Sequence, residues 1–322
     1  MKSNITTDFS CGSTTDADSW TGKVSVKPTP NSVAKATARS KRTSWPAKSY
    51  TMEPGDIYYS DGAMTHQSEA LASGKTPIGI VGYIGSDYWT EKGVVSGKGG
   101  HALVMCLKTI GSTGSTKAAQ EGKNVQTYIG TPYAWYSSNI DAGRTKVTSK
   151  SDIENSCNKT SGSGYTETDA LITKWGPAAA AAYQAQNYKT LPAPTNKCTG
   201  WFLPTAGQYY AVMTNLGATF SSDWTGIWDG NTSTHPNEGF FNNMTTVTTN
   251  INNKLKKVGD SNYTEFFGSV NTWAWTSSEF SSLYAVQVDS GVNDSKGSGS
   301  VRFASYGYGK IPQGPVRPFL AF

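Results

Sequence analysis

The pattern of hydrophobic and polar positions divides the chain near residue 50. Residues 1–50 mix Ser, Thr, Lys and Gly without a sustained period of 2 or 3.6, which predicts an irregular, extended arm. Beyond the arm, three apolar stretches have the length and β-branched content of buried strands. The first of them ends at the turn dipeptide Asp61-Gly62. The predicted strands are Ile57–Ser60, Pro77–Gly85 and His101–Leu107.

Three segments carry helical spacing. The first begins at the capping-box-like Thr166–Asp169, is interrupted at Gly176-Pro177 and resumes over Ala178–Gln184. The second begins at Thr205, which can cap the helix while Gln208 reaches back to it. The apolar face of the second helix consists of Tyr209, Val212, Met213 and Leu216, and the helix is expected to end at Gly217. The apolar face of the third consists of Val247, Ile251, Leu255 and Val258, and that helix is expected to end at Gly259.

The last fifty or so residues, Thr272–Phe322, are the most informative part of the chain. Short strands such as the alternating run Tyr284–Asp289 are separated by polar Gly/Ser/Asn loops, with aromatic residues at the loop edges. This pattern favours a rigid platform that displays a surface over a catalytic cleft. Residues 110–165 are polar and rich in Gly and Ser, and predict a loop-rich insertion. The whole pattern predicts an α+β domain over residues 51–322, with small antiparallel sheets, two or three flanking helices and long ordered loops.

Composition supports this picture. Among 322 residues, 36% are hydrophobic and 16% charged, both low for a cytosolic enzyme, whereas aromatic residues at 12% suit binding surfaces. The formal net charge is +5, and much of the excess lies before residue 50. Because the arm lacks dense basic runs, we expect no nucleic-acid partner. We also expect no membrane span, and no signal peptide is visible, so either a leader has been removed or the protein uses no secretion pathway.

The four cysteines, Cys11, Cys106, Cys157 and Cys198, have no metal-ligand spacing. Cys106 lies in the apolar run Ala102–Leu107 and is expected to be a buried thiol. Cys157 and Cys198 both precede loop-like segments, and the sequence leaves open whether they pair.

Residues Gly200–Gln208 match a helix-entry motif, W-x-L-P-(S/T)-x-x-(E/Q). On this motif the chain resembles a C-type-lectin-like group that includes fimbrillin-like surface proteins of gut anaerobes and the variable proteins of diversity-generating retroelements. The resemblance covers roughly residues 53–322 and leaves out the arm. The other motifs that carry it are Gly55–Gly62, Pro77–Val81, Gly100–Val104, Trp275–Glu279, Tyr284-Ala285 and Val316–Pro318.

The resemblance implies a C-type-lectin-like fold, in which two helices flank a small antiparallel sheet and loops near the C-terminus face the ligand. In diversified relatives those loops vary while the framework is kept. The implied framework residues are Trp201, Leu203, Pro204, Trp275, Ser277, Ser278, Glu279, Val316, Arg317 and Pro318. The implied ligand-binding residues are Trp273, Ser281, Ser282, Leu283, Tyr284, Asn293, Asp294, Ser295, Ser305, Tyr306 and Tyr308.

Glu279 and Arg317 also invite an interpretation that does not depend on the resemblance. Both are charged residues beside Trp or Pro at strand edges, where burial would require a partner. We hypothesise that Glu279 contacts Arg317 or the backbone and so fixes the last loop. The alternative is that both are surface charges.

Chemistry that would make the chain an enzyme is not visible. His66, His101 and His235 are far apart in sequence and lie in no metal-binding or triad-like context. Calcium-dependent lectins use paired motifs, and the nearest matches here, Trp228–Asn231 and Val292–Asp294, lack a partner. The related formylglycine-generating enzymes use cysteines near the C-terminus, and this chain has none after Cys198. We therefore expect no enzyme activity, no cofactor and no metal.

These observations predict a non-enzymatic attachment protein that binds a bacterial surface glycan or protein receptor. The first setting considered is a phage virion, with the arm attached to tail or capsid proteins. The alternatives are a bacterial adhesin or fimbrial tip whose leader was removed, bound to fimbrial proteins through its arm, and a structural decoration or connector protein of a virion. The expected location is thus a virion surface or the extracellular cell surface. The ligand, a homo-oligomeric state and diversification of the loops all stay open.

Overall fold

The structure is a computed structural model, and two compact units are distinguished along the chain, Met1–Thr51 and Met52–Phe322. In the first unit, strand β1 (Thr6–Phe9) pairs antiparallel with strand β2 (Gly22–Ser25). The sequence predicted irregular chain there, because strands of four residues are too short for their period to stand out. The described residues are 6–9, 22–25, 50–85, 102–110, 146–155, 164–195, 198–218, 244–266, 273–280, 285–291, 300–304 and 315–322.

The second unit is built on a five-stranded antiparallel sheet with the strand order β10-β6-β5-β3-β4. Its first hairpin turns at Asp61-Gly62, where Gly62 has a φ of 86° that favours glycine and Asp61 accepts a hydrogen bond from the amide of Ala63. All three strands predicted in this part of the chain are confirmed. The strands are β3 (Ile57–Tyr59), β4 (Met64–Thr65), β5 (Pro77–Ile84), β6 (Ala102–Cys106) and β10 (Phe319–Ala321).

Both faces of this sheet are buried. Since successive side chains of a strand point to opposite faces, Ile57 and Tyr59 join one apolar core while Tyr58 joins another with Trp201. Tyr58 also stacks on Phe322, with ring centroids 4.6 Å apart. Burial on both faces explains why these strands are continuous apolar runs in the sequence.

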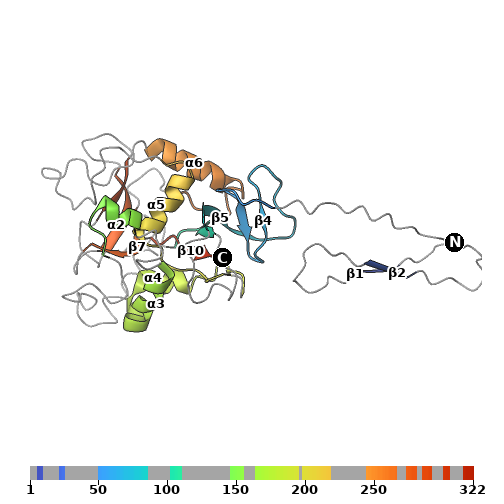
Figure 1. The fold of residues 1–322 in the computed structure, drawn as a ribbon, viewed down its shortest axis with the longest axis horizontal. Helices are drawn as coiled ribbons and strands as arrows, with labels where there is room; N and C mark the ends of the chain where they lie inside the picture. The colour runs from blue at the N-terminus through green and yellow to red at the C-terminus, as the bar shows by residue number, and fades with distance from the viewer. Residues whose placement is uncertain are drawn as a thin grey trace, which may run out of the picture. The chain divides into compact units, whose positions relative to one another are not determined.

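Two helices pack on the first of these cores, α5 (Ala206–Asn215) and α6 (Met244–Lys256), and Figure 1 labels both. The predicted capping box of α5 is present, because Thr205 accepts from the Gln208 amide and Gln208 accepts from the Thr205 amide. α5 also lies close to β5 at Gly82, where a Cβ atom would come within 2.5 Å of Val212.

The remaining described helices are α2 (Lys150–Asn155), α3 (Gly164–Trp175) and α4 (Ala180–Gln186), with the 3₁₀ turn η1 (Gly176–Ala178) between the last two. The predicted interruption at Gly176-Pro177 is confirmed, and α3 begins two residues before the predicted start. α2 lies inside the region predicted as a loop-rich insertion. A helix of six residues is too short to show a helical period.

A second antiparallel sheet contains β7 (Trp273–Glu279), β8 (Ala285–Gly291) and β9 (Ser300–Ala304) in that order. Val286, Val288 and Phe303 from this sheet reach the core that also holds α5 and α6. The predicted α+β class with antiparallel sheets is thus confirmed, whereas the C-type-lectin-like fold stays a prediction. Among the described helices, none has the length and apolar character needed to cross a bilayer.

Candidate functional site

Strand β7 is polar in sequence and yet wholly buried over Thr276–Glu279. Buried polar groups need partners, and here α3 and the chain at the entry of α5 supply them. The Ser277 amide donates to the Pro204 carbonyl at 2.8 Å, and the Ser277 hydroxyl donates to Glu167 of α3. The Ser278 hydroxyl accepts from the first amide of α5, that of Ala206, at 3.1 Å. The strand therefore joins the entries of two helices through side chains that the sequence placed in the framework.

Arg317 is the second buried junction, since its side chain is only 3% exposed. One terminal nitrogen donates to the carbonyl of Cys106 at 3.0 Å and more weakly to that of Leu107 at 3.4 Å. The other donates to the carbonyls of Thr264 and Glu265 at 2.7 and 2.9 Å. Burial lowers the pKa of Arg317, but the guanidinium stays charged at neutral pH. Arg317 therefore ties the C-terminal segment to the end of β6 and to the loop after α6.

The hypothesised contact between Glu279 and Arg317 is not what the described residues show, because the guanidinium binds main-chain carbonyls instead. The alternative of two surface charges is also wrong, since Glu279 and Arg317 are both buried. Glu279 is held through its backbone, where its carbonyl accepts from the Val147 amide at 2.7 Å. Arg317 binds carbonyls instead of Glu279 because its forked guanidinium can reach the carbonyls of two separate loops at once.

The other predicted framework residues are buried as well. The indole N–H of Trp201 donates to the Leu191 carbonyl at 2.6 Å, and Trp275 is only 6% exposed. Pro204 lies buried just before the capping residue of α5. The amide of Trp275 donates to the carbonyl of Pro315, so β7 also contacts the C-terminal segment. Their predicted role in a framework that supports ligand binding stays a prediction.

Most of the predicted ligand-binding residues lie outside the described part of the chain. Trp273 begins β7, and its backbone pairs with Asp289. The positions outside the described residues are Ser281, Ser282, Leu283, Tyr284, Asn293, Asp294, Ser295, Ser305, Tyr306 and Tyr308.

The strand register still shows to which end of the three-stranded sheet these segments attach. Ala285 and Ala304 mark one end, because Glu279 pairs with Ala285 and Ala304 pairs with Gln287. Gly291 pairs with Ser300 at the other end, which is also the end where Trp273 pairs with Asp289. The segments 281–284 and 305–314 therefore attach at one end of the sheet, and 292–299 attaches at the end of Trp273.

An apolar hollow lies beside β7, but it is small. Its cavity volume is only about 10 Å³, between Leu171, Trp275, Ala285 and several alanines at the start of α4. Pockets for organic ligands are usually larger, roughly 300–1,000 Å³, and include placed polar groups. Among the described residues this hollow is therefore a poor candidate for a ligand site.

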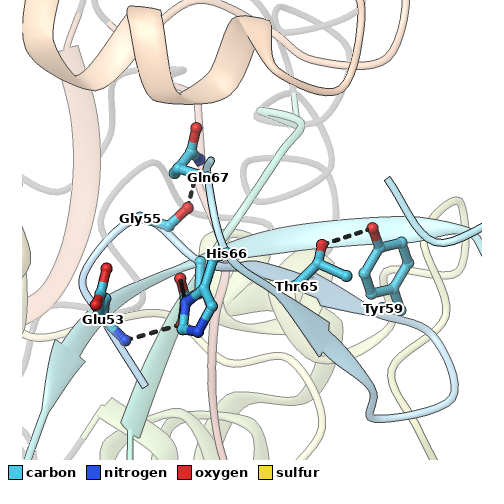
Figure 2. Close-up of polar contacts among 7 residues, drawn as sticks. Glu53, Gly55, Tyr59, Thr65, His66 and Gln67 are labelled. Atoms are coloured by element: carbon cyan, nitrogen blue, oxygen red, sulfur yellow. Dashed lines mark hydrogen bonds and ion pairs between the residues drawn. The ribbon is translucent and has the colours of Figure 1, made fainter. Parts of the chain in front are cut away.

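A separate polar cluster of Glu53, Asp56 and His66 lies at the base of the first hairpin. Figure 2 shows Glu53 and His66 at this place. Ile57 pairs with Thr65, so the same antiparallel register places Asp56 opposite His66. His66 Nδ1 lies 3.0 Å from Asp56 Oδ1, and the Glu53 amide donates to Asp56 Oδ2 at 2.8 Å. Asp56 is only 1% exposed, His66 is partly exposed and Glu53 is exposed. The hydrogen bond to Asp56, partly offset by lost solvation, raises the pKa of His66.

Gln67, the residue after His66, fixes the segment that carries Glu53 and Asp56. The side-chain amide nitrogen of Gln67 donates to the carbonyl of Gly55 (Figure 2). It also donates, at 3.2 Å, to the carbonyl of Lys254 in α6. Gly55 has a φ of 104°, a backbone conformation that favours glycine. The segment before β3 is thus attached both to its own hairpin and to α6.

Sequence reasoning missed the cluster of Glu53, Asp56 and His66. It judged His66 by its sequence neighbours, which lack a metal-binding pattern. The signal that would have found it is a hairpin turn centred on Asp61, because residues equally far before and after the central residue of such a turn lie opposite each other. Asp56 and His66 are such a pair.

The described cysteines are buried and free. Cys106 is fully buried, as predicted, and burial raises its pKa to about 12. Cys198 is a free thiol that donates to the Pro194 carbonyl at 3.3 Å, and Cys157, with which the sequence left a pairing open, lies outside the described residues.

No protein-family model and no curated protein matches the chain. A structural similarity exists to a fimbrial protein from Bacteroides ovatus, with 20% sequence identity and a TM-score of 0.41. It covers 84% of this chain and 49% of that one, so the chain spans about half the length of the fimbrial protein. At this TM-score the similarity does not assign the chain to that protein's fold.

Proposed function

We propose that this chain is a non-enzymatic attachment protein that binds a bacterial surface receptor through segments near its C-terminus. The observation that supports the proposal is the buried polar framework of β7 and Arg317. It fixes the strands of the second sheet and the C-terminal segment through hydrogen bonds that lie within the described core. Segments joined to such fixed strand ends can change in sequence without loss of the fold.

The register of the sheet refines the proposed binding surface. Positions 281, 282, 284, 305, 306 and 308 belong to segments that attach at one end of the sheet, whereas 273, 293 and 294 belong to the other end. A single receptor of ordinary size contacts one continuous patch. We therefore place the receptor at the end marked by Ala285 and Ala304, which carries Tyr284, Tyr306 and Tyr308 on its attached segments. Tyrosine suits this role because it combines contact area with a hydrogen-bonding hydroxyl.

The setting that we propose is a bacterial cell surface, with the arm bound to fimbrial or other surface proteins. No observation of the structure or of the comparisons supports the virion settings considered from the sequence. The receptor is a glycan or a protein of a neighbouring cell or host surface. Homo-oligomers are compatible with this function and are not required by it.

The test is saturable binding of the full chain to isolated cell envelopes, compared between two sets of substitutions. One set changes Tyr284, Tyr306 and Tyr308 to Ala, and the other changes Trp273, Asn293 and Asp294 to Ala. We expect the first set to weaken binding at least about tenfold, as loss of central aromatic contacts does, and the second to leave it nearly unchanged. Binding is expected to persist in EDTA, because the proposed contacts need no metal. Equal binding by the parent chain and the first set would refute the proposal.

A further inference from the structure

Glu53, Asp56 and His66 combine two carboxylates with one imidazole at a place where three chain positions converge. One ligand atom from each residue lies within 4.8 Å of the ligand atoms of the other two. Among the described residues, this is the group of three or more His, Cys, Asp or Glu side chains whose ligand atoms lie close enough together to hold one metal ion. The geometry points to a binding site for a single divalent transition-metal ion, of which Zn²⁺ fits the donor set best. This inference does not depend on the proposed attachment function.

The spacing of Asp56 and His66 fits two ligands of one ion. Zinc binds imidazole nitrogen and carboxylate oxygen at about 2.0–2.2 Å, so two ligand atoms of a tetrahedral set lie about 3.4 Å apart. Asp56 Oδ1 and His66 Nδ1 are separated by 3.0 Å. The ion would therefore replace the proton that the two side chains share once the two ligand atoms move apart by about 0.4 Å, a shift that side-chain rotation can supply.

Asp56 is also fixed in the way that metal ligands usually are. Its second oxygen accepts the amide hydrogen of Glu53 at 2.8 Å, and the side chain is almost fully buried. Such outer hydrogen bonds orient a ligating carboxylate and hold it in place before the ion arrives. The backbone of Glu53 is thereby held next to Asp56.

Glu53 is the third ligand, and it lies at the solvent-exposed side of the site. Its side chain is exposed, so the carboxylate can move the remaining distance toward the other two ligand atoms. His66 is 18% exposed at its side chain, which leaves the site open to an ion from solution. Water completes the tetrahedral set. The nitrogen ligand favours zinc-like ions over Ca²⁺ and Mg²⁺, which prefer oxygen ligands alone.

The consequence for the protein is a clamp at the base of the first hairpin. The ion would connect Glu53 and Asp56, which precede β3, to His66, which follows β4. The next residue, Gln67, already binds the backbone of α6. Because the unfolded chain does not hold the three ligands together, bound metal stabilises the folded state by mass action.

The experiment titrates Zn²⁺ into the full chain after removal of metal with a chelator, and follows both heat release and the melting temperature. We expect one Zn²⁺ per chain, and a melting temperature raised by several degrees at roughly a hundredfold excess over the dissociation constant. Glu53→Gln and His66→Gln are each expected to weaken the affinity at least about tenfold. Glu69→Gln is the matched control, because Glu69 is an exposed acidic residue three positions after His66, and it should bind like the parent.

A second readout keeps the test valid if His66→Gln folds poorly. Glu53→Gln changes an exposed side chain and is expected to fold normally, and Co²⁺ in place of Zn²⁺ reports its ligands by absorption. We expect a spectrum without a thiolate-to-cobalt charge-transfer band. Unchanged affinity in Glu53→Gln and His66→Gln, tighter binding of Ca²⁺ than of Zn²⁺, a thiolate band or the absence of saturable binding would each overturn the inference.

Discussion

Arg317 shows how one buried cation can organise a chain without a carboxylate partner among the described residues. Its guanidinium binds the carbonyls of Cys106, Leu107, Thr264 and Glu265, and it lies 5.6 Å from the ring centre of Phe266. A forked donor is needed for this, since a single ammonium group cannot reach carbonyls on both sides. The residue thus joins three segments that are more than fifty positions apart in sequence.

Replacement of Arg317 by Ala is expected to lower the free energy of unfolding by about 3 kcal/mol or more, because the buried or part-buried carbonyls of Cys106, Thr264 and Glu265 lose a charged donor. Arg317→Lys should lose somewhat less. Urea unfolding measures the difference, and Lys256→Ala is the control, since removal of that exposed charge should change stability by no more than about 0.5 kcal/mol. If Arg317→Ala unfolded at the same urea concentration as the parent, its role as a junction would be wrong.

At the scale of elements, much of the secondary structure could be predicted from local patterns. The capping box at Thr205 and Gln208, the break at Gly176-Pro177 and the turn at Asp61-Gly62 are all short-range signals, and the structure confirms each of them. Contacts between distant segments could not be predicted in this way. Such contacts depend on strand register and tertiary packing. Examples are the hydrogen bond between Glu279 and Val147, the carbonyl partners of Arg317 and the contact of Asp56 with His66.

Helix α2 is the element whose stability should depend most clearly on pH. Asp152 accepts hydrogen bonds from the amides of Thr148 and Ser149, and the Ser149 hydroxyl accepts from the Asp152 amide. Partial burial acts to raise the pKa of Asp152, but the hydrogen bonds from Thr148 and Ser149 outweigh it and lower the pKa overall. The stabilisation by this carboxylate is therefore complete above the ordinary pKa of Asp and is lost as the pH falls through the lowered value.

We expect Asp152→Ala to cost about 1 kcal/mol at neutral pH, the usual contribution of a helix cap. The stability difference between parent and variant should shrink as the pH falls below about 4, where the carboxylate becomes protonated. Urea unfolding at a series of pH values measures this difference. A gap that stays constant down to pH values near 2 would show that the charge of Asp152 does not matter.

At the scale of the whole molecule, the described residues of the last fifty positions form part of the core. Residues 274–279 of β7 and residues 315–321 are buried, and β10 is a strand of the five-stranded sheet. The predicted platform therefore lies in the interior, and the segments 281–284 and 305–314 connect its parts. This division of roles underlies the proposed function, because it separates the residues that fold the domain from those that would bind a receptor.

The most direct test of this division replaces segments 281–284 and 305–314 with Gly/Ser chains of equal length and measures melting temperature and envelope binding on the same preparation. We predict a melting temperature within roughly 2–4 °C of the parent, a change of about 1 kcal/mol, together with loss of binding. Retained binding, or a chain that no longer folds, would contradict the account.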